Sequence, residues 1–363
     1  MTLISEGRAR AAAAATRPVA HFAIPGDLAT PTGGYGYDRR LIAGLGEIGW
    51  DVRHVELPGG FPFPGAAARA EAERRLAEAP AGATLLVDGL ALGALPEAAA
   101  AAAARLRLVA LVHHPLGDEA GLTAAERAGL VASERAALAS AETVVCTSPA
   151  TAARLAAGFG IGLERIVVAP PGVDPAPRSR GDGAPPLILS VGSLIPRKRH
   201  DVLIAALARI ADRPWRARIV GSAALDPACA AALAAQAAAS GLGERIELVG
   251  AVADTRAMMA EADIFALASE YEGYGMAFAE AMSQGLPVVA CNAAAIAALV
   301  PATAGGLAPP GDVEAFSGVL AGLLDDPARR SAAAEAAFRA GLGLPRWADT
   351  AAIVSGALAA GPR

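Results

Sequence analysis

The chain alternates short apolar runs with segments of helical periodicity, and it does so on both sides of a stretch rich in proline, glycine and charge. This alternation is typical of α/β folds, in which a helix follows each strand of a parallel sheet. The expected strands are 19–24, 52–56, 84–87, 109–112, 143–146 and 166–168 in the first half, and 187–191, 217–220, 246–249, 264–267 and 288–290 in the second.

A chain of 363 residues is long enough for two domains, each with its own core. We predict an α/β protein with two Rossmann-like domains whose parallel sheets face each other across a cleft. Ligands are then expected at the carboxyl ends of both sheets. The predicted parts are an N-terminal extension at 1–18, a first domain at 19–175, a linker at 176–186, a second domain at 187–343 and a C-terminal segment at 344–363, with a helix near 347–358.

Composition excludes several other classes of protein. The net charge of -5 gives no general attraction to nucleic acid or to anionic lipid. The three cysteines show no C-x-x-C spacing, so neither a disulfide framework nor a zinc site is predicted, and a reducing cytoplasm is the expected location. No apolar stretch reaches membrane-spanning length without a charge, glycine or proline, so we expect at most a peripheral contact with membranes.

The stretch 269–290, SEYEGYGMAFAEAMSQGLPVVA, combines carboxylates with glycines at a predicted strand-to-helix turn. The helix is expected at 277–284, and its first amides, including those of Gly275, Met276 and Ala277, lack partners and can bind phosphate. Glu272 precedes this helix and Glu280 lies one turn inside it, so both can face one crevice. Carboxylates that accept hydrogen bonds from hydroxyl groups, beside amides that donate hydrogen bonds to phosphate, favour a sugar nucleotide as the ligand. The alternative is that Glu280 only complements the helix dipole.

A basic loop follows the first expected strand of the second domain. The strand ends near Gly192, and three consecutive cations follow at 197–199. These side chains can clamp a diphosphate through charge-assisted hydrogen bonds. The alternative is a solvated, charged turn.

In the first domain, His113 and His114 stand at the carboxyl end of the expected strand 109–112, and Glu119 follows them. Isolated histidines are more often structural than catalytic, but the end of a strand is where an α/β crevice begins. The glycine loop 31–38 follows the first strand and opens a helix. A second glycine pattern, G-x-G-x-x-G at 44–49, lies between a helix and a strand, which is the reverse of the order that a dinucleotide site needs, so no NAD site is predicted.

Several of these stretches resemble one family, the family 4 retaining glycosyltransferases. Residues 269–290 match its E-x7-E signature, and 190–205 is similar to its V-G-R-L-x-x-x-K-G motif, with Lys198 on the phosphate-binding lysine. Ser193 stands where the family usually has arginine, and Arg199 replaces a glycine, so Arg197 or Arg199 is expected to supply the missing cation. Shorter matches follow in the family's order at 145–148, 168–174, 219–222, 248–252, 262–264 and 309–312.

The resemblance implies a GT-B fold and a retaining, metal-independent transfer of a hexose-type sugar from a nucleotide diphosphate sugar to a hydroxyl of a glycan, lipid-linked or small-molecule acceptor. It implies no cofactor and no metal, and a final helix that crosses back to the first domain. Glu280 would hold the ribose, Glu272 the sugar hydroxyls and Lys198 the diphosphate. His113, Glu272 and Lys198 would be catalytic. The implied donor-binding residues are Gly33, Gly34, Gly192, Ser193, Arg197, Lys198, Val249, Val252, Glu272, Gly273, Tyr274, Gly275, Met276, Ala277 and Glu280, with His114 and Glu119 as further candidates on the acceptor side.

Two other functions fit the same residues. A nucleotide-sugar-dependent synthase, phosphorylase or epimerase would keep the donor motifs and change the acceptor. A catalytically silent sugar-nucleotide binding protein would keep them without turnover, and Ser193 favours this alternative. The donor base, the sugar and the acceptor depend on the shape of the pocket.

Overall fold

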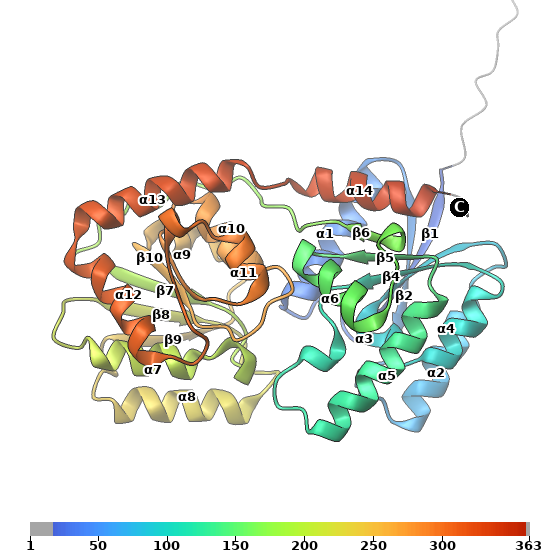
Figure 1. Ribbon diagram of the computed structural model, residues 1–363, viewed down its shortest axis with the longest axis horizontal. Helices are drawn as coiled ribbons and strands as arrows, with labels where there is room; N and C mark the ends of the chain where they lie inside the picture. Colours follow the sequence, from blue (N-terminus) through green and yellow to red (C-terminus); the bar gives the residue numbers. More distant parts are fainter. Residues whose placement is uncertain (1–16, 361–363) are drawn as a thin grey trace, which may run out of the picture.

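The computed structural model describes residues 17–360 and contains two α/β domains side by side (Figure 1). The N-terminal domain has a six-stranded sheet in the order β2-β1-β3-β4-β5-β6, and the C-terminal domain has one in the order β12-β11-β10-β7-β8-β9. Every strand pairing in both sheets is parallel. The predicted fold is therefore confirmed. The N-terminal extension expected at 1–18 lies almost wholly outside the described residues.

The strands are short and mostly buried, because helices cover both faces of each sheet. All but one of the described strands were predicted, to within two residues at either end. The exception is the glycine-containing β12, GGLA, which lacks a strand-like run. The strands are β1 Val19–Pro25, β2 Asp51–Leu57, β3 Thr84–Asp88, β4 Arg107–Val112, β5 Thr143–Cys146, β6 Ile166–Val168, β7 Leu187–Val191, β8 Arg216–Val220, β9 Ile246–Gly250, β10 Ile264–Leu267, β11 Val288–Cys291 and β12 Gly305–Ala308.

Several helices begin at a side chain that accepts a hydrogen bond from the first turn, as Asp312 does from Ala315 N at 2.8 Å. The helix predicted at 277–284 begins and ends one residue earlier. The α-helices are α1 Gly33–Glu47, α2 Ala66–Ala77, α3 Gly89–Leu92, α4 Pro96–Ala103, α5 Ala124–Ser140, α6 Pro149–Phe159, α7 His200–Arg209, α8 Pro227–Ala239, α9 Arg256–Glu261, α10 Met276–Ser283, α11 Ala294–Leu299, α12 Val313–Asp325, α13 Pro327–Leu342 and α14 Trp347–Ala359. The short 3-10 helices are η1 Leu116–Asp118, η2 Leu163–Arg165, η3 Pro196–Lys198 and η4 Ala302–Ala304.

Each sheet has a point where the chain changes the side on which it adds strands. This point lies between β1 and β3 in the first sheet and between β7 and β10 in the second. Loops that leave neighbouring strands in opposite directions at such a point open a crevice at the carboxyl edge of the sheet. The glycine loop follows β1, the basic loop follows β7 and the stretch with Glu272 follows β10. The fold therefore brings the predicted motifs to these two crevices.

The chain passes between the domains twice, and the two crossings lie side by side. The first begins after Val173 and the second at Pro345, and Val173 N donates to Pro345 O at 2.9 Å. After the second crossing α14 lies over the N-terminal domain (Figure 1). There Thr350 Oγ1 donates to Pro170 O at 2.7 Å, and the Trp347 ring packs edge-on 5.6 Å from that of Tyr37.

The segment 176–186 is bound to the C-terminal domain. The buried carboxylate of Asp263 accepts hydrogen bonds from Gly183 N at 2.9 Å and from Leu187 N at 2.7 Å. The buried Gln284 donates through Nε2 to Pro177 O at 2.8 Å. These bonds make the segment part of the C-terminal domain's surface.

Among residues 17–360, no helix combines the length and the apolar character needed to cross a lipid bilayer.

Candidate active site

The carboxyl edges of the two sheets are in direct contact. Thr151 Oγ1 in α6 donates to Gly273 O at 3.1 Å. A Cβ placed on Gly273 would lie 2.0 Å from His113 O, so only glycine permits this approach of two backbones. A Cβ placed on Gly33 would lie 3.8 Å from Met276 Sδ. The first-domain loops and the loop before α10 therefore form the two sides of one cleft.

Glu272 forms the central ion pairs on the C-terminal side of this cleft. One of its oxygens lies 2.6 Å from Lys198 Nζ, and the other lies 3.6 Å from Arg197 Nη1. Burial raises the pKa of Glu272, but the attraction of Lys198 and Arg197 outweighs it and the pKa is lowered. Burial lowers the pKa of Lys198, and Glu272 opposes that shift only in part. Two predicted site residues that we assigned to different parts of a donor are thus paired with each other.

Lys198 is the only lysine in the sequence, although lysine and arginine together number 31. Every other position that carries one of these two cations has arginine. An ammonium group is more compact than a guanidinium and its pKa shifts more readily on burial, so the two are not equivalent in a buried site. The use of lysine at this one position is a signal for function in the composition itself.

Glu280 differs from Glu272 in its contacts. Within the described residues, its carboxylate makes no hydrogen bond and no ion pair, and the residue is partly buried near the start of α10. Burial raises its pKa to about 7, and the nearby Asp174 adds to that shift. The amides of Met276 and Ala277 at the start of the same helix have no acceptor within it. An unpaired acceptor beside unpaired donors is suited to a ligand that carries both hydroxyls and an anion.

On the N-terminal side, His113 lies between two buried carboxylates. Its Nε2 is 3.1 Å from Asp38 Oδ1 and 3.6 Å from Asp88 Oδ2. Burial lowers the pKa of His113, but the two aspartates raise it to about 10. Burial raises the pKa of Asp38 to about 7, whereas hydrogen bonds and the charge of His113 lower that of Asp88 against the effect of burial. At neutral pH an imidazolium therefore faces the ionised Asp88.

The sequence interpretation missed both aspartates, although each has a signal. Asp88 ends the strand TLLVD at the carboxyl edge of the sheet and accepts a hydrogen bond from Leu90 N at 2.7 Å. Asp38 lies on the buried side of α1, next to Tyr37 and one turn before Leu41. A carboxylate among apolar residues that face a core is unusual and requires a partner.

Asp38, Asp88 and His113 are also the residues that could hold a metal ion, since their ligand atoms lie within 4.8 Å of one another. The separation of 3.1 Å between Nε2 and Oδ1 is that of a hydrogen bond. Leu90 N already occupies one oxygen of Asp88. We interpret the group as a buried ion pair, and the absence of a metal stays a prediction.

Glu119 links the two domains. Its carboxylate lies 2.9 Å from Arg197 Nε and 3.2 Å from His114 Nε2. Burial raises its pKa, but these two partners lower it to about 2. His114 and Glu119 are therefore held at the mouth of the cleft.

The turn after β7 is held in place by contacts with Lys198 and His200. A Cβ placed on Gly192 would lie 3.3 Å from Lys198 Cδ, so the lysine side chain runs directly over this glycine. The buried His200 donates from Nε2 to Gly192 O at 3.1 Å, and burial lowers its pKa to about 4, so the ring is neutral. Ser193 lies in the turn between them.

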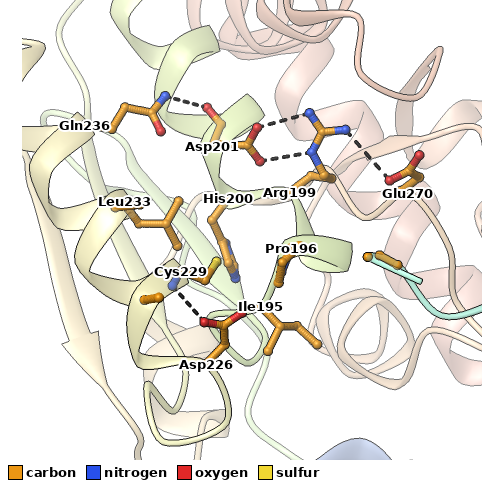
Figure 2. Close-up of a pocket in the computed structure, with 14 residues that line it drawn as sticks. Ile195, Pro196, Arg199, His200, Asp201, Asp226, Cys229, Leu233, Gln236 and Glu270 are labelled. Carbon is orange, nitrogen blue, oxygen red and sulfur yellow. Dashed lines mark hydrogen bonds and ion pairs between the residues drawn. The ribbon is translucent and has the colours of Figure 1, made fainter. Parts of the chain in front are cut away.

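Arg199 points away from this cluster. Its Nε lies 3.0 Å from Asp201 Oδ1, and its Nη1 lies 3.9 Å from Glu270. Figure 2 shows these residues at the wall of a cavity of about 580 Å³ that is also lined by Ile195, Pro196 and residues of α8. Ala120 and Gly121 of the N-terminal domain also line this cavity, so it lies between the domains, behind the basic loop.

Of the other predicted donor residues, Gly34 lies in the first turn of α1, where a placed Cβ would be 3.3 Å from the His113 ring, and the rest lie on the C-terminal domain. Val249 and Val252 are partly buried against its core at the end of β9 and in the loop that follows. Tyr274 is partly buried, and burial raises its pKa to about 12. Their contacts with a donor stay predictions.

Two family models match the chain. "Glycosyltransferase Family 4" matches residues 89–177, and "Glycosyl transferases group 1" matches residues 185–326. Among curated proteins, D-inositol 3-phosphate glycosyltransferase of Xylanimonas cellulosilytica is 32% identical over 220 residues, which are 54% of this chain and 52% of the relative. GDP-mannose-dependent alpha-(1-6)-phosphatidylinositol monomannoside mannosyltransferase of Mycobacterium tuberculosis is 32% identical over 175 residues, 41% of this chain and 43% of the relative. The chain spans about half the length of such relatives.

Solved structures resemble the whole fold. Sucrose-phosphate synthase from Thermosynechococcus elongatus superposes with a TM-score of 0.78 at 20% identity, over 94% of this chain and 98% of that one. Anabaena HepE, in a complex with UDP and glucose, gives a TM-score of 0.75 at 20% identity, over 95% of this chain and 100% of that one. Structural neighbours of this kind are GT-B glycosyltransferases, so the two-domain architecture is the GT-B fold.

Proposed function

Because the chain belongs to the family 4 glycosyltransferases, with both of its domains matched by family models, we propose that it transfers a hexose-type sugar from a nucleoside diphosphate sugar to a hydroxyl group, with retention of configuration and without a metal ion. The observation that carries the proposal is the difference between Glu280 and Glu272. Glu280 leaves its carboxylate unpaired beside a free helix start, as a ribose site requires. Glu272 holds the chain's only lysine at 2.6 Å.

Each part of the donor has a group of matching chemistry. The ribose hydroxyls would donate to Glu280, and the diphosphate would lie between Lys198 and the first amides of α10. The sugar hydroxyls would donate to Glu272, which releases Lys198 to the phosphate. The sugar would then lie beside the point where the backbones of Gly273 and His113 meet.

The reaction exchanges one bond at the anomeric carbon. The acceptor oxygen forms a bond to this carbon as the bond to the β-phosphate oxygen breaks, and the acceptor's proton passes to the departing phosphate on the same face. Lys198 and the α10 amides stabilise the charge that develops on the diphosphate, which is the largest catalytic contribution expected from fixed donors in a buried site. His113, held as an imidazolium by Asp38 and Asp88, would orient the sugar.

The test begins with thermal shift measurements of the wild-type chain with UDP, GDP, ADP and TDP. Two relatives are named as GDP-mannose-dependent, and HepE was solved with UDP, so GDP and UDP come first. The nucleotide that stabilises the protein selects the sugars to test for turnover, and NMR of the product gives its anomeric configuration. The acceptors to test first are inositol phosphate and phosphatidylinositol mannosides, after the names of the relatives.

A glycoside product with the donor's configuration supports the proposal. An inverted product contradicts retention. An altered donor sugar without transfer indicates an epimerase, and tight nucleotide binding without any turnover of the matching sugars indicates a binding protein.

A further inference from the structure

The basic loop lacks an arginine at the position where the resembling family usually has its second diphosphate cation. Ser193 stands there, in the turn after β7. A serine hydroxyl can donate one hydrogen bond but carries no charge, so it does not replace a guanidinium beside a diphosphate. Another cation must balance the charge if the site binds a nucleoside diphosphate.

Arg197 lies where such a cation is needed. Its Nη1 is 3.6 Å from Glu272 Oε2, and Lys198 Nζ is 2.6 Å from the other oxygen of the same carboxylate. The two cations therefore share one acceptor, as they would share the oxygens of a diphosphate. The side chain of Arg197 is only 12% exposed, so its charge is held in the cleft and is weakly screened by water.

The guanidinium of Arg197 is not saturated by its protein partners. Within the described residues it donates from Nε to Glu119 Oε1 at 2.9 Å and from Nη1 to Tyr271 O at 2.9 Å. Arginine carries more N–H groups than these two bonds use. No nitrogen of Arg197 is among the buried polar atoms that lack a partner in the described residues, so the remaining N–H groups reach solvent and are open to a ligand with acceptor oxygens.

Arg199, the other candidate for this role, is committed elsewhere. It pairs with Asp201 through two nitrogens at 3.0 and 3.1 Å and faces the cavity behind the loop (Figure 2). Its side chain is 28% exposed, more than twice as much as that of Arg197. It is therefore a matched control, because it is a cation of the same loop whose ion pairs in the described residues are with Asp201 and Glu270 and not with Glu272.

We propose that Arg197 is the second diphosphate-binding cation of this chain, displaced by four positions from Ser193, and that Glu119 of the N-terminal domain is the positioning residue that holds it. The proposal rests on the proposed function. Because Glu119 belongs to the opposite domain, the diphosphate site is complete only when the two domains are in contact. Donor affinity is thereby coupled to closure of the cleft through one ion pair.

The experiment compares binding of nucleoside diphosphates and monophosphates by calorimetry, with UDP against UMP and GDP against GMP. The ratio of the two dissociation constants isolates the contribution of the second phosphate. For Arg197→Ala we expect this ratio to fall about 10-fold to 100-fold, as loss of a charge-assisted hydrogen bond predicts, while monophosphate affinity stays the same. For Arg199→Ala the ratio should not change.

The double variant Arg197→Ala with Ser193→Arg returns a cation to the family position. We expect it to recover most of the lost ratio, which a general destabilisation of the loop would not allow. Thermal unfolding of every variant shows whether it is folded, and Arg197→Lys, which keeps the charge but not the forked geometry, provides a milder substitution. It should give an intermediate ratio.

Glu119→Gln tests the positioning role. It should lower the ratio about 3-fold to 10-fold in the wild-type background and have no effect in the Arg197→Ala background, because the two residues act in series. Independent effects of the two substitutions would contradict the role of Glu119.

The outcomes separate this inference from the proposed function. If the wild-type chain binds none of UDP, GDP, ADP and TDP, both fail. If it binds one of them and Arg197→Ala leaves the ratio unchanged, or if Arg199→Ala lowers it equally, the proposed function stands and Arg197 is not the diphosphate cation.

Discussion

The two sides of the cleft both contain buried ion pairs, but they use them differently. On the C-terminal side, two cations share the carboxylate of Glu272, Arg197 also pairs with Glu119, and within the described residues some of their N–H groups have no acceptor. On the N-terminal side, a single cation, His113, is enclosed by Asp38 and Asp88. The first arrangement has donors to spare and can accept an anion. The second encloses its one cation between carboxylate oxygens, which leaves less positive charge to attract an anion.

This difference shows that buried ion pairs can have different functions. A buried cluster in which two cations share one carboxylate and keep free N–H groups is suited to binding an anion, because the protein carboxylate stands in place of part of the ligand. A buried pair with an excess of carboxylates is closer to a support that sets the charge and orientation of one ring. Substitutions on the two sides should therefore change different measurable quantities.

Removal of Lys198 should have the largest effect. Lys198→Ala deletes a fixed donor to the leaving diphosphate and should remove about 2 to 4 kcal/mol of transition-state stabilisation. The measurement is kcat/KM for the best donor, with diphosphate and monophosphate affinities beside it. If the loop 197–199 is merely a solvated turn, this variant will behave like Arg199→Ala and change little.

Glu272→Ala sharpens the comparison, because it removes the carboxylate that both cations share. Its sugar contact should be lost, so turnover should fall by about 1.5 to 3 kcal/mol, the range for hydrogen bonds to charged groups. Affinity for UDP or GDP should be equal to or higher than that of wild type, since Lys198 no longer has a competing partner. Equal losses of nucleotide affinity and turnover would contradict this division of roles.

Glu280 should respond to pH as well as to mutation. Glu280→Ala should weaken free nucleotide and donor alike by about 1 to 2 kcal/mol, because the ribose contact is common to both. With a pKa raised to about 7, the carboxylate takes up a proton as pH falls below neutrality and loses its charge. Nucleotide affinity should therefore rise from pH 6 to pH 8 in the wild type and not in Glu280→Gln, as titration by calorimetry at both pH values will test.

Substitutions on the N-terminal side of the cleft should change the stability of the protein. At pH 7, Asp88→Asn leaves the imidazolium of His113 without its ionised partner and should cost about 1 to 2 kcal/mol more in the free energy of unfolding than Asp38→Asn. Asp38 is easier to replace because its raised pKa already favours the neutral form. Denaturant unfolding of both variants decides this point, and a larger cost for Asp38→Asn would reverse the assignment of charge.

Addition of EDTA should have no effect on turnover. Lys198 and the helix start of α10 provide the positive charge that a metal ion would provide in a metal-dependent enzyme. Loss of activity in EDTA with recovery in Mn2+ or Mg2+ would instead identify Asp38, Asp88 and His113 as metal ligands and contradict our interpretation of that group.

Most of the fold follows from the sequence because buried parallel strands appear as continuous apolar runs, whose position depends little on distant contacts. β10 and β5 occur within the predicted bounds for this reason. β12 was missed because its pairing with β11, and not its own residues, makes Gly305 and Gly306 part of a strand. Here tertiary context outweighs local propensity.

The site was predictable where it lies on one continuous segment, and not where it depends on contacts between segments. Glu272 and Glu280 are found together in one motif. The partners of His113 come from α1 and from the end of β3, and the pairing of Glu119 with Arg197 joins different domains. No spacing in a single sequence encodes such contacts. The sequence does show, however, that the only lysine is at position 198.

The two adjacent crossings between the domains limit how they can move. Since Val173 and Pro345 are hydrogen-bonded to each other, both connections pass through nearly one place, and rotation about it leaves them intact. A body tethered in this way has few degrees of freedom, and its cleft faces stay at a high effective concentration even when they separate. When separated domains close again, the tether therefore brings Arg197 back to Glu119 directly. The entropy cost of bringing the two domains together is incurred once, when the chain folds.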